Sequence, residues 1–168
     1  MSNRIAPFEY AASSVTEVIR DVRILIVDDD DILRGVHEAV LSHAGYGTNS
    51  AADGEEALAL LAADDFDLIL TDCNMPRLDG LGLIRAIRAS GNRIPIMMVS
   101  SSLLEGGLPD DVRAEVAVAL PKPVRTLELL AGVAIALQTG PRGQPPRLNL
   151  TISVTNNWSE HDEHSSNR

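Results

Sequence analysis

The chain has 168 residues, of which 45% are hydrophobic and 3% aromatic, enough for one well-packed domain with an aliphatic core. Its net charge is −10, and residues 22–139 hold 9 basic and 18 acidic side chains, which argues against nucleic-acid binding. One cysteine excludes an internal disulfide, and no apolar run reaches the ~18 residues that cross a membrane, so we expect a cytoplasmic protein without a membrane partner.

The first half of this central region alternates between strand and helix patterns. The continuous apolar run Ile24–Val27 predicts a strand buried on both faces. Apolar residues at helical spacing predict a helix over 31–43 that stops near Gly45. A weak strand over 46–50 follows, and Asp53 is placed to cap the next helix.

The second half continues the alternation. In chain order it predicts a strand over 68–70, a helix over 81–90, a strand over 94–99, an irregular segment or short helix over 101–115, a strand over 116–120 and a helix over 124–138. On that last helix we expect one apolar face made of Leu127, Leu130, Ala131, Ala134 and Ile135. The pattern indicates an α/β protein with a flavodoxin-like, doubly wound, five-stranded parallel sheet in the order 2-1-3-4-5.

The two ends of the chain differ from this core. We expect an N-terminal extension over 1–21, a single domain over 22–139, and a linker and tail over 140–168. The extension has helix-like spacing of apolar residues. The tail begins with a Gly- and Pro-rich linker, after which alternating apolar residues predict a late strand. Those residues are Leu148, Leu150, Ile152 and Val154.

Polar side chains follow four of the predicted strands directly. Asp28 and Asp29 follow the first strand, Asp72 the third, Ser100 the fourth, and Lys122, the only lysine in the chain, the fifth. Because ligands of such sheets bind at the carboxyl ends of the strands, we expect these groups to converge on one edge.

The chemistry of this set points to phosphoryl transfer. Clustered carboxylates need a compensating cation, and an all-oxygen site suits Mg²⁺. A carboxylate beside Mg²⁺ can attack a phosphoryl group and form an acyl phosphate, while a lysine and a hydroxyl hold the remaining oxygens. Four other aspartates have structural roles open to them, because Asp30 and Asp31 begin a helix, where carboxylates cap free N–H groups, and Asp53 and Asp79 precede helices that they can cap.

With these residues in place, residues 22–139 resemble the receiver domain of two-component response regulators. The stretches that carry the resemblance are Val27-Asp28-Asp29, Leu70-Thr71-Asp72 through Asp79-Gly80, Met97 through Ser101, and Leu120-Pro121-Lys122-Pro123. The resemblance implies that Asp72 accepts a phosphoryl group from the phosphohistidine of a sensor kinase or phosphotransfer protein. It also implies a Mg²⁺ site formed by Asp29, by Asp28 partly through water, by Asp72 and by the backbone carbonyl of Asn74.

The resemblance assigns roles around the phosphoryl group as well. Ser100 would bond a phosphoryl oxygen after transfer, and Lys122 would pair first with Asp72 and then with the phosphoryl group. The Lys122–Pro123 bond is a candidate cis peptide. Asn74 and Ser102 stand near the attacking water in this family and would tune the lifetime of the phosphate.

Three positions depart from the family pattern. Ala119 stands where an aromatic residue is usual, three positions before the lysine, so a rotating ring cannot carry the signal here. Ser101 replaces a small alanine. The segment 101–115, with two glycines and a proline, matches a regular fourth helix poorly.

Three hypotheses of different classes follow. We expect a single-domain response regulator that signals to an unknown downstream protein or passes phosphate along a relay, because the 29 residues after Thr139 are too few for a typical DNA-binding module. The alternative is a Mg²⁺-dependent phosphohydrolase of the haloacid dehalogenase type, for which Asp28 and Asp30 supply only the first part of the motif. A third possibility is a receiver-like module that binds partners without phosphorylation, which the intact acidic residues and Lys122 disfavour.

Overall fold

The structure is a computed structural model that describes residues 22–104 and 106–140. The predicted helical pattern in the extension and the predicted late strand in the tail lie outside these residues. Within the described ranges, no helix is both long enough and apolar enough to cross a membrane.

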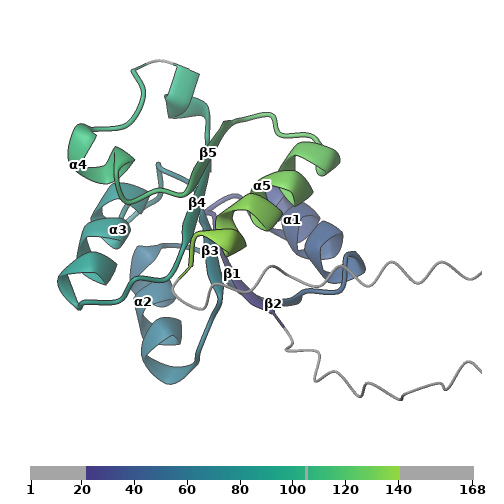
Figure 1. The fold of residues 1–168 in the computed structure, drawn as a ribbon, viewed down its shortest axis with the longest axis horizontal. Coiled ribbons are helices and arrows are strands. Elements are labelled where there is room, and N and C mark those ends of the chain that lie inside the picture. The colour runs from purple at the N-terminus through teal and green to yellow at the C-terminus, as the bar shows by residue number, and fades with distance from the viewer. Residues whose placement is uncertain (1–21, 105, 141–168) are drawn as a thin grey trace, which may run out of the picture.

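A parallel sheet with helices on both faces makes up the domain (Figure 1). The strands are β1 (Arg23–Val27), β2 (Gly47–Ala51), β3 (Leu68–Thr71), β4 (Ile96–Ser100) and β5 (Val118–Pro121). The helices are α1 (Asp31–His43), α2 (Gly54–Ala63), α3 (Gly80–Ala89), α4 (Asp110–Arg113) and α5 (Thr126–Gln138), with a 3-10 turn η1 (Ser101–Leu104).

The sheet order is β2-β1-β3-β4-β5, and all four pairings are parallel, which confirms the predicted flavodoxin-like architecture. Alternate residues of each strand point to opposite faces, so two apolar layers form. Leu25, Ile69 and Met98 face α2, α3 and α4, while Ile26 and Met97 face α1 and α5. Figure 1 shows the same division of the helices between the two faces.

Three of the four aspartates predicted to cap helices do so, whereas Asp31 is the first residue of α1. Asp30 accepts hydrogen bonds from the backbone N–H groups of the first turn of α1, and Asp53 does the same for α2. Asp79 accepts from the backbone N–H of Gly82 in α3. Each carboxylate satisfies backbone donors that would otherwise lack a partner and interacts favourably with the helix dipole. The three caps therefore define where α1, α2 and α3 begin after the strands that precede them.

The predicted apolar face of α5 is wrong. The helix buries Leu129, Val133 and Ala136 against the sheet, whereas Leu127 and Ile135 are exposed. Because α5 is apolar almost all round, with Glu128 as its single charged residue, periodicity does not determine which side faces the core.

The segment after β4 is irregular, as expected. It contains the short η1 and the one-turn α4, and ion pairs hold it to α3. The Arg88 Nε lies 2.7 Å from a carboxylate oxygen of Glu115, and the Arg85 Nε lies 2.8 Å from one of Asp111. Ala119 is exposed on β5 and lines an open, mainly apolar cavity of about 360 Å³ beside η1.

Candidate functional site

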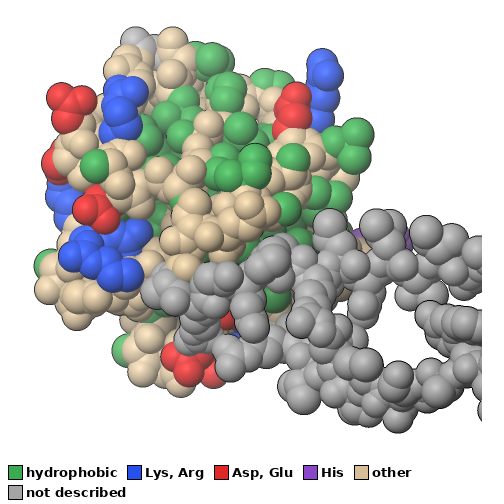
Figure 2. Space-filling model, in the orientation of Figure 1, with side chains coloured by type: hydrophobic (Ala, Val, Ile, Leu, Met, Phe, Trp, Pro, Cys, Tyr) green, Lys and Arg blue, Asp and Glu red, His purple; other side chains and the backbone are tan. Residues whose placement is uncertain are grey.

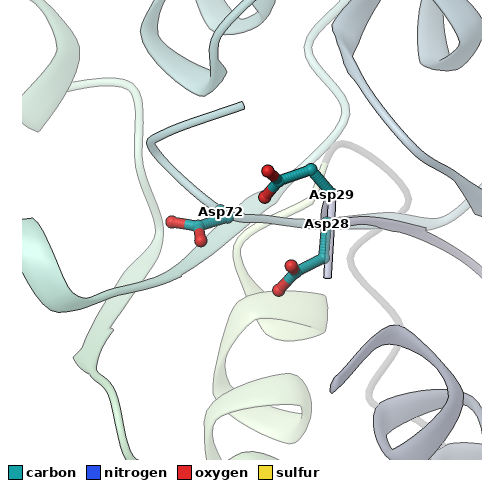
Figure 3. Close-up of side chains that lie close together, drawn as sticks. All are labelled: Asp28, Asp29 and Asp72. Carbon is teal, nitrogen blue, oxygen red and sulfur yellow. The ribbon is translucent and has the colours of Figure 1, made fainter. Parts of the chain in front are cut away.

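The carboxyl ends of β1 and β3 bring the predicted acidic residues together. The backbone N–H of Asp72 donates to the carbonyl of Val27 at 2.9 Å, which extends the β1–β3 pairing to the point where the aspartates begin. One carboxylate oxygen from each of Asp28, Asp29 and Asp72 lies within 4.8 Å of the other two. Figure 3 shows the three side chains at these adjacent strand ends. The predicted convergence of carboxylates is present.

Lys122 joins this cluster from the end of β5. Its Nζ lies 2.5 Å from Oδ2 of Asp72 and 2.9 Å from Oδ2 of Asp28, and the Lys122–Pro123 bond is cis, as expected. Burial lowers the pKa of the Lys122 ammonium, but its hydrogen bonds to Asp72 and Asp28 raise that pKa above its ordinary value. Lys122 is therefore a permanent cation that bridges two carboxylates.

The Asp72 carboxylate is ionised and held in one orientation. Its Oδ1 accepts hydrogen bonds from the backbone N–H groups of Cys73 at 2.5 Å and Asn74 at 3.3 Å. Burial raises the pKa of Asp72, but hydrogen bonds from Lys122 and Ser100 outweigh that effect and hold the pKa below its ordinary value. A buried, ionised carboxylate of this kind is equipped to act as a nucleophile.

Gly80 is required for the loop that follows Asp72. A Cβ at this position would lie 2.0 Å from the backbone carbonyl oxygen of Asp72, and the Gly80 N–H donates to the Cys73 carbonyl at 2.8 Å. Only glycine permits this close approach of two backbone segments. The turn between β3 and α3 is thus closed tightly beneath the carboxylate.

Ser100 lies at the end of β4 and is fully buried. Its backbone carbonyl accepts from the N–H of Lys122 at 3.3 Å, so the hydroxyl and the ammonium come from paired strand ends. The Ser102 hydroxyl lies 3.4 Å from that of Ser100 and accepts a hydrogen bond from the Asn74 amide at 2.5 Å. These contacts connect the loops after β3 and β4 above the site.

The donor set fits a hard divalent cation. Asp28 and Asp72 share the Lys122 ammonium, whereas no group among residues 22–104 and 106–140 donates a hydrogen bond to the exposed Asp29 carboxylate. Three carboxylates near one ammonium leave net negative charge, which a cation with oxygen ligands would neutralise. The chemistry of these side chains is therefore that of a magnesium-type site.

Some contacts at the site edge were not predicted. The guanidinium of Arg77, a residue with φ of 61°, pairs with the fully buried Asp53, and the Arg34 guanidinium donates to the Asp28 carbonyl at 2.6 Å. His37 is buried in α1 near Asp28 and Lys122. Arg34 and His37 fall in the first two turns of the helix predicted over 31–43, so helical spacing could have marked them as neighbours of Asp28. Nothing in the loop pattern marks Arg77 as a partner of Asp53.

Comparison with known proteins identifies the family. The response regulator receiver domain family matches residues 24–134, which is well over half of the chain. The chain belongs to the receiver domain family. Receiver domains accept phosphoryl groups in two-component signalling, with histidine kinases as partners, and are signalling modules rather than enzymes. The acidic cluster seen in this receiver domain agrees with that assignment.

Curated relatives extend beyond the receiver domain. The response regulator MprA of Mycolicibacterium vanbaalenii is 41% identical over 119 residues, which cover 70% of this chain and 51% of the relative. MprA of Mycobacterium avium is 38% identical over 135 residues, which cover 79% of this chain and 58% of the relative. The chain thus spans about half the length of the curated relatives it matches, so a single-domain organisation remains a proposal.

Solved receiver domains share the fold over nearly the whole of their own length. The receiver domain of NtrX from Brucella abortus aligns with a TM-score of 0.64 at 29% identity, covering 70% of this chain and 99% of the other. Chemotaxis response regulator CheY4 of Vibrio cholerae aligns with a TM-score of 0.60 at 32% identity, covering 67% and 95%.

The structure does not place the second carboxylate that the hydrolase alternative requires at the site. Its motif needs Asp30 beside Asp28 at the reaction centre, but Oδ1 of Asp30 accepts hydrogen bonds from the N–H groups of Ile32 and Leu33 at 2.9 and 3.1 Å. Asp30 is committed to capping α1 and is unsuited to proton transfer at the site.

Proposed function

We propose that this protein is a single-domain response regulator that accepts a phosphoryl group from the phosphohistidine of a sensor kinase or phosphotransfer protein onto Asp72. The observation that carries the proposal is the convergence of the Asp28, Asp29 and Asp72 carboxylates with the Lys122 ammonium at the strand ends. A carboxylate oxygen of Asp72 attacks phosphorus, the phosphorus–nitrogen bond of the donor breaks, and its electron pair returns to the imidazole. The product is an aspartyl phosphate.

The surrounding residues hold the phosphoryl group during this step. Lys122 already contacts Oδ2 of Asp72 and is placed to pair with a phosphoryl oxygen once that oxygen carries the charge. The Ser100 hydroxyl, buried at the end of β4, supplies a hydrogen bond to a second oxygen. The Asn74–Ser102 hydrogen bond joins the loops that follow β3 and β4, and we expect it to control how readily water reaches the acyl phosphate.

We propose Mg²⁺ as the cofactor. Asp28, Asp29, Asp72 and the backbone carbonyl of Asn74 would hold it, and the bound ion would neutralise charge on the transferring phosphoryl group. Without a cation, the negative charge of the three carboxylates would repel an incoming phosphoryl group.

An exposed apolar pair on α1 provides a surface for the phosphodonor. Ile32 and Val36 are 80% and 52% exposed and lie one turn apart in the first half of α1, the helix that starts beside Asp28 and Asp29. A helix of the donor that presents a phosphohistidine can pack against this pair while the histidine approaches Asp72.

We propose that output occurs through protein–protein interaction or a phosphorelay, without nucleic-acid binding. The support is the acidic balance of the domain, which lacks the excess of basic side chains that phosphate backbones require. Beryllofluoride, a mimic of the phosphoryl group, should increase retention of the full-length protein on a protein partner and leave retention on DNA at background. Beryllofluoride-dependent DNA binding would contradict this part of the proposal.

Labelling with a small phosphodonor tests the acceptor. Acetyl phosphate with Mg²⁺ should phosphorylate the protein, and Asp72→Asn should abolish the label. Asp79→Asn is the matched control, because that carboxylate caps α3 outside the carboxylate cluster, and its label should persist. A label on Asp72→Asn at the stoichiometry of the native protein would exclude Asp72 as the acceptor.

A further inference from the structure

The outer face of α5 carries an uncovered apolar stripe. Leu127 and Ile135 are 80% and 54% exposed, and Ala131, also exposed, lies between them at four-residue spacing. Figure 2 shows hydrophobic side chains gathered over this helix. The opposite face of α5 is already buried on the sheet. A helix that is apolar on both sides is usually covered on both, so the stripe indicates an interaction surface.

We propose that residues 148–154 of this chain bind along the outer face of α5. This segment contains no charged residue, and its apolar side chains alternate with polar ones. In an extended segment, alternate side chains lie about 6.6 Å apart. Helix positions four residues apart lie about 6 Å apart along the axis. The spacing of the apolar side chains in the segment therefore matches the spacing of Leu127, Ala131 and Ile135 along the helix.

The connection allows this arrangement. The tail leaves at Gly140, just beyond the end of α5 and close to Pro95. Residues 141–147 span at most about 25 Å when extended, whereas the 13 residues of α5 extend over about 20 Å. The segment can thus turn back and run antiparallel to the helix with slack in the linker. In a parallel arrangement, the linker would first have to run back along the whole of α5, which would use almost all of its extended length.

Addition of the segment to the sheet as a parallel strand outside β5 is disfavoured by handedness. α1 and α5 pack on one face of the sheet, and α2, α3 and α4 pack on the other. The crossovers that move the chain toward β5 use the second face. A new strand outside β5 would be reached through α5, which lies on the face that α1 covers. The chain would then move outward past β5 with its crossover on the opposite face from α2, α3 and α4. That arrangement is the rare left-handed connection. The stripe on α5 is the better site.

Disulfide capture in the full-length protein tests the proposal. One variant carries Ala131→Cys with Leu150→Cys, and its control carries Ala131→Cys with Ser159→Cys, which places the second thiol in the polar part of the tail. Tethering alone should favour the nearer thiol by roughly threefold, because effective concentration falls with about the −3/2 power of linker length. Docking should make the first crosslink form more than about tenfold faster than the control. Peptide mapping separates these crosslinks from the buried native Cys73.

Charges placed on the stripe provide the second variant. Leu127→Glu with Ile135→Glu alters exposed positions, so the fold should persist, and the first crosslink should slow to the roughly threefold advantage over the control that tethering alone gives. A rate ratio of roughly threefold or less between the two cysteine pairs is what tethering alone gives and would overturn the proposal. A disulfide that forms only between two chains would overturn it too, since a second copy would then cover the stripe. Labelling of Asp72 is measured on the same variants and should be unchanged, so the outcome is independent of the proposed phosphoacceptor function.

Discussion

Replacement of Lys122 by methionine should destabilise the protein and make its stability depend on Mg²⁺. The Asp28 and Asp72 side chains are only 4% and 10% exposed, and both contact the Lys122 ammonium. Without it, two carboxylates no more than 4.8 Å apart repel by about 3.5 kcal/mol at an effective dielectric constant of about 20. In mutagenesis experiments, removal of one partner of a buried ion pair lowers the free energy of unfolding by about 3–5 kcal/mol. We expect a loss of about 3–4 kcal/mol at pH 7.5.

The loss should shrink as the pH falls or as Mg²⁺ is added. In the variant, the mutual repulsion raises the pKa of one carboxyl, so protonation of the pair relieves the penalty under mildly acid conditions. Mg²⁺ replaces the missing positive charge and should stabilise Lys122→Met more than it stabilises the native protein. Urea unfolding at pH 7.5 and 5.5, with and without Mg²⁺, measures both effects.

Lys122→Arg is the matched control, because it retains the charge and changes only the shape of the donor. It should lose less than half as much stability as Lys122→Met and should show no enhanced response to Mg²⁺. A loss below about 1 kcal/mol for Lys122→Met, or a Mg²⁺ effect equal to that of the native protein, would refute the electrostatic reasoning.

Three further perturbations test the surroundings of the site. Gly80→Ala should cost about 2–4 kcal/mol in urea unfolding, because its Cβ would collide with the backbone of Asp72. Gly35→Ala in α1 is the control: the added Cβ meets no atom within 4 Å, so the substitution should stabilise the protein by about 0.5–1 kcal/mol. Equal changes in stability for the two glycine substitutions would refute the steric argument. Arg77→Gln should cost about 1–3 kcal/mol, part of which Asp53→Asn recovers, since the buried carboxylate loses its cation. Burial lowers the pKa of His37, so stability should fall below about pH 6.5 by up to about 1.4 kcal/mol per pH unit, and His37→Leu should flatten that decline.

The site was predictable because its residues have no competing structural explanation. Asp72 follows a buried strand and precedes no helix, so neither capping nor solvation accounts for it. By contrast, Asp30 and Asp53 each directly precede the first residue of a helix, so helix capping explains them without a role at the site. In a parallel sheet, the order of the strands then determines which ends are neighbours.

The parts that could not be predicted depend on tertiary contacts. The side of α5 that faces the sheet is decided by packing, because Leu127 and Leu129 are equally apolar in the sequence. The Arg77–Asp53 pair depends on a positive φ at an arginine, which brings its side chain over the start of α2. Non-glycine residues adopt that conformation only where the surrounding structure requires it.

The strand-end carboxylate cluster and the segment that follows Ser100 are structurally different parts of this receiver domain. Asp28, Asp72 and Lys122 follow strands of one continuous sheet, of which β1, β3 and β4 are almost fully buried. η1 starts at the residue after Ser100, and Leu104 at its end is 70% exposed beside the cavity that Ala119 lines. Because Ala119 has no ring, we expect a displacement of the Ser100 hydroxyl to reach the surface through the main chain of η1. Because none of the residues of η1 is fully buried, we expect it to shift more readily than the sheet beneath it.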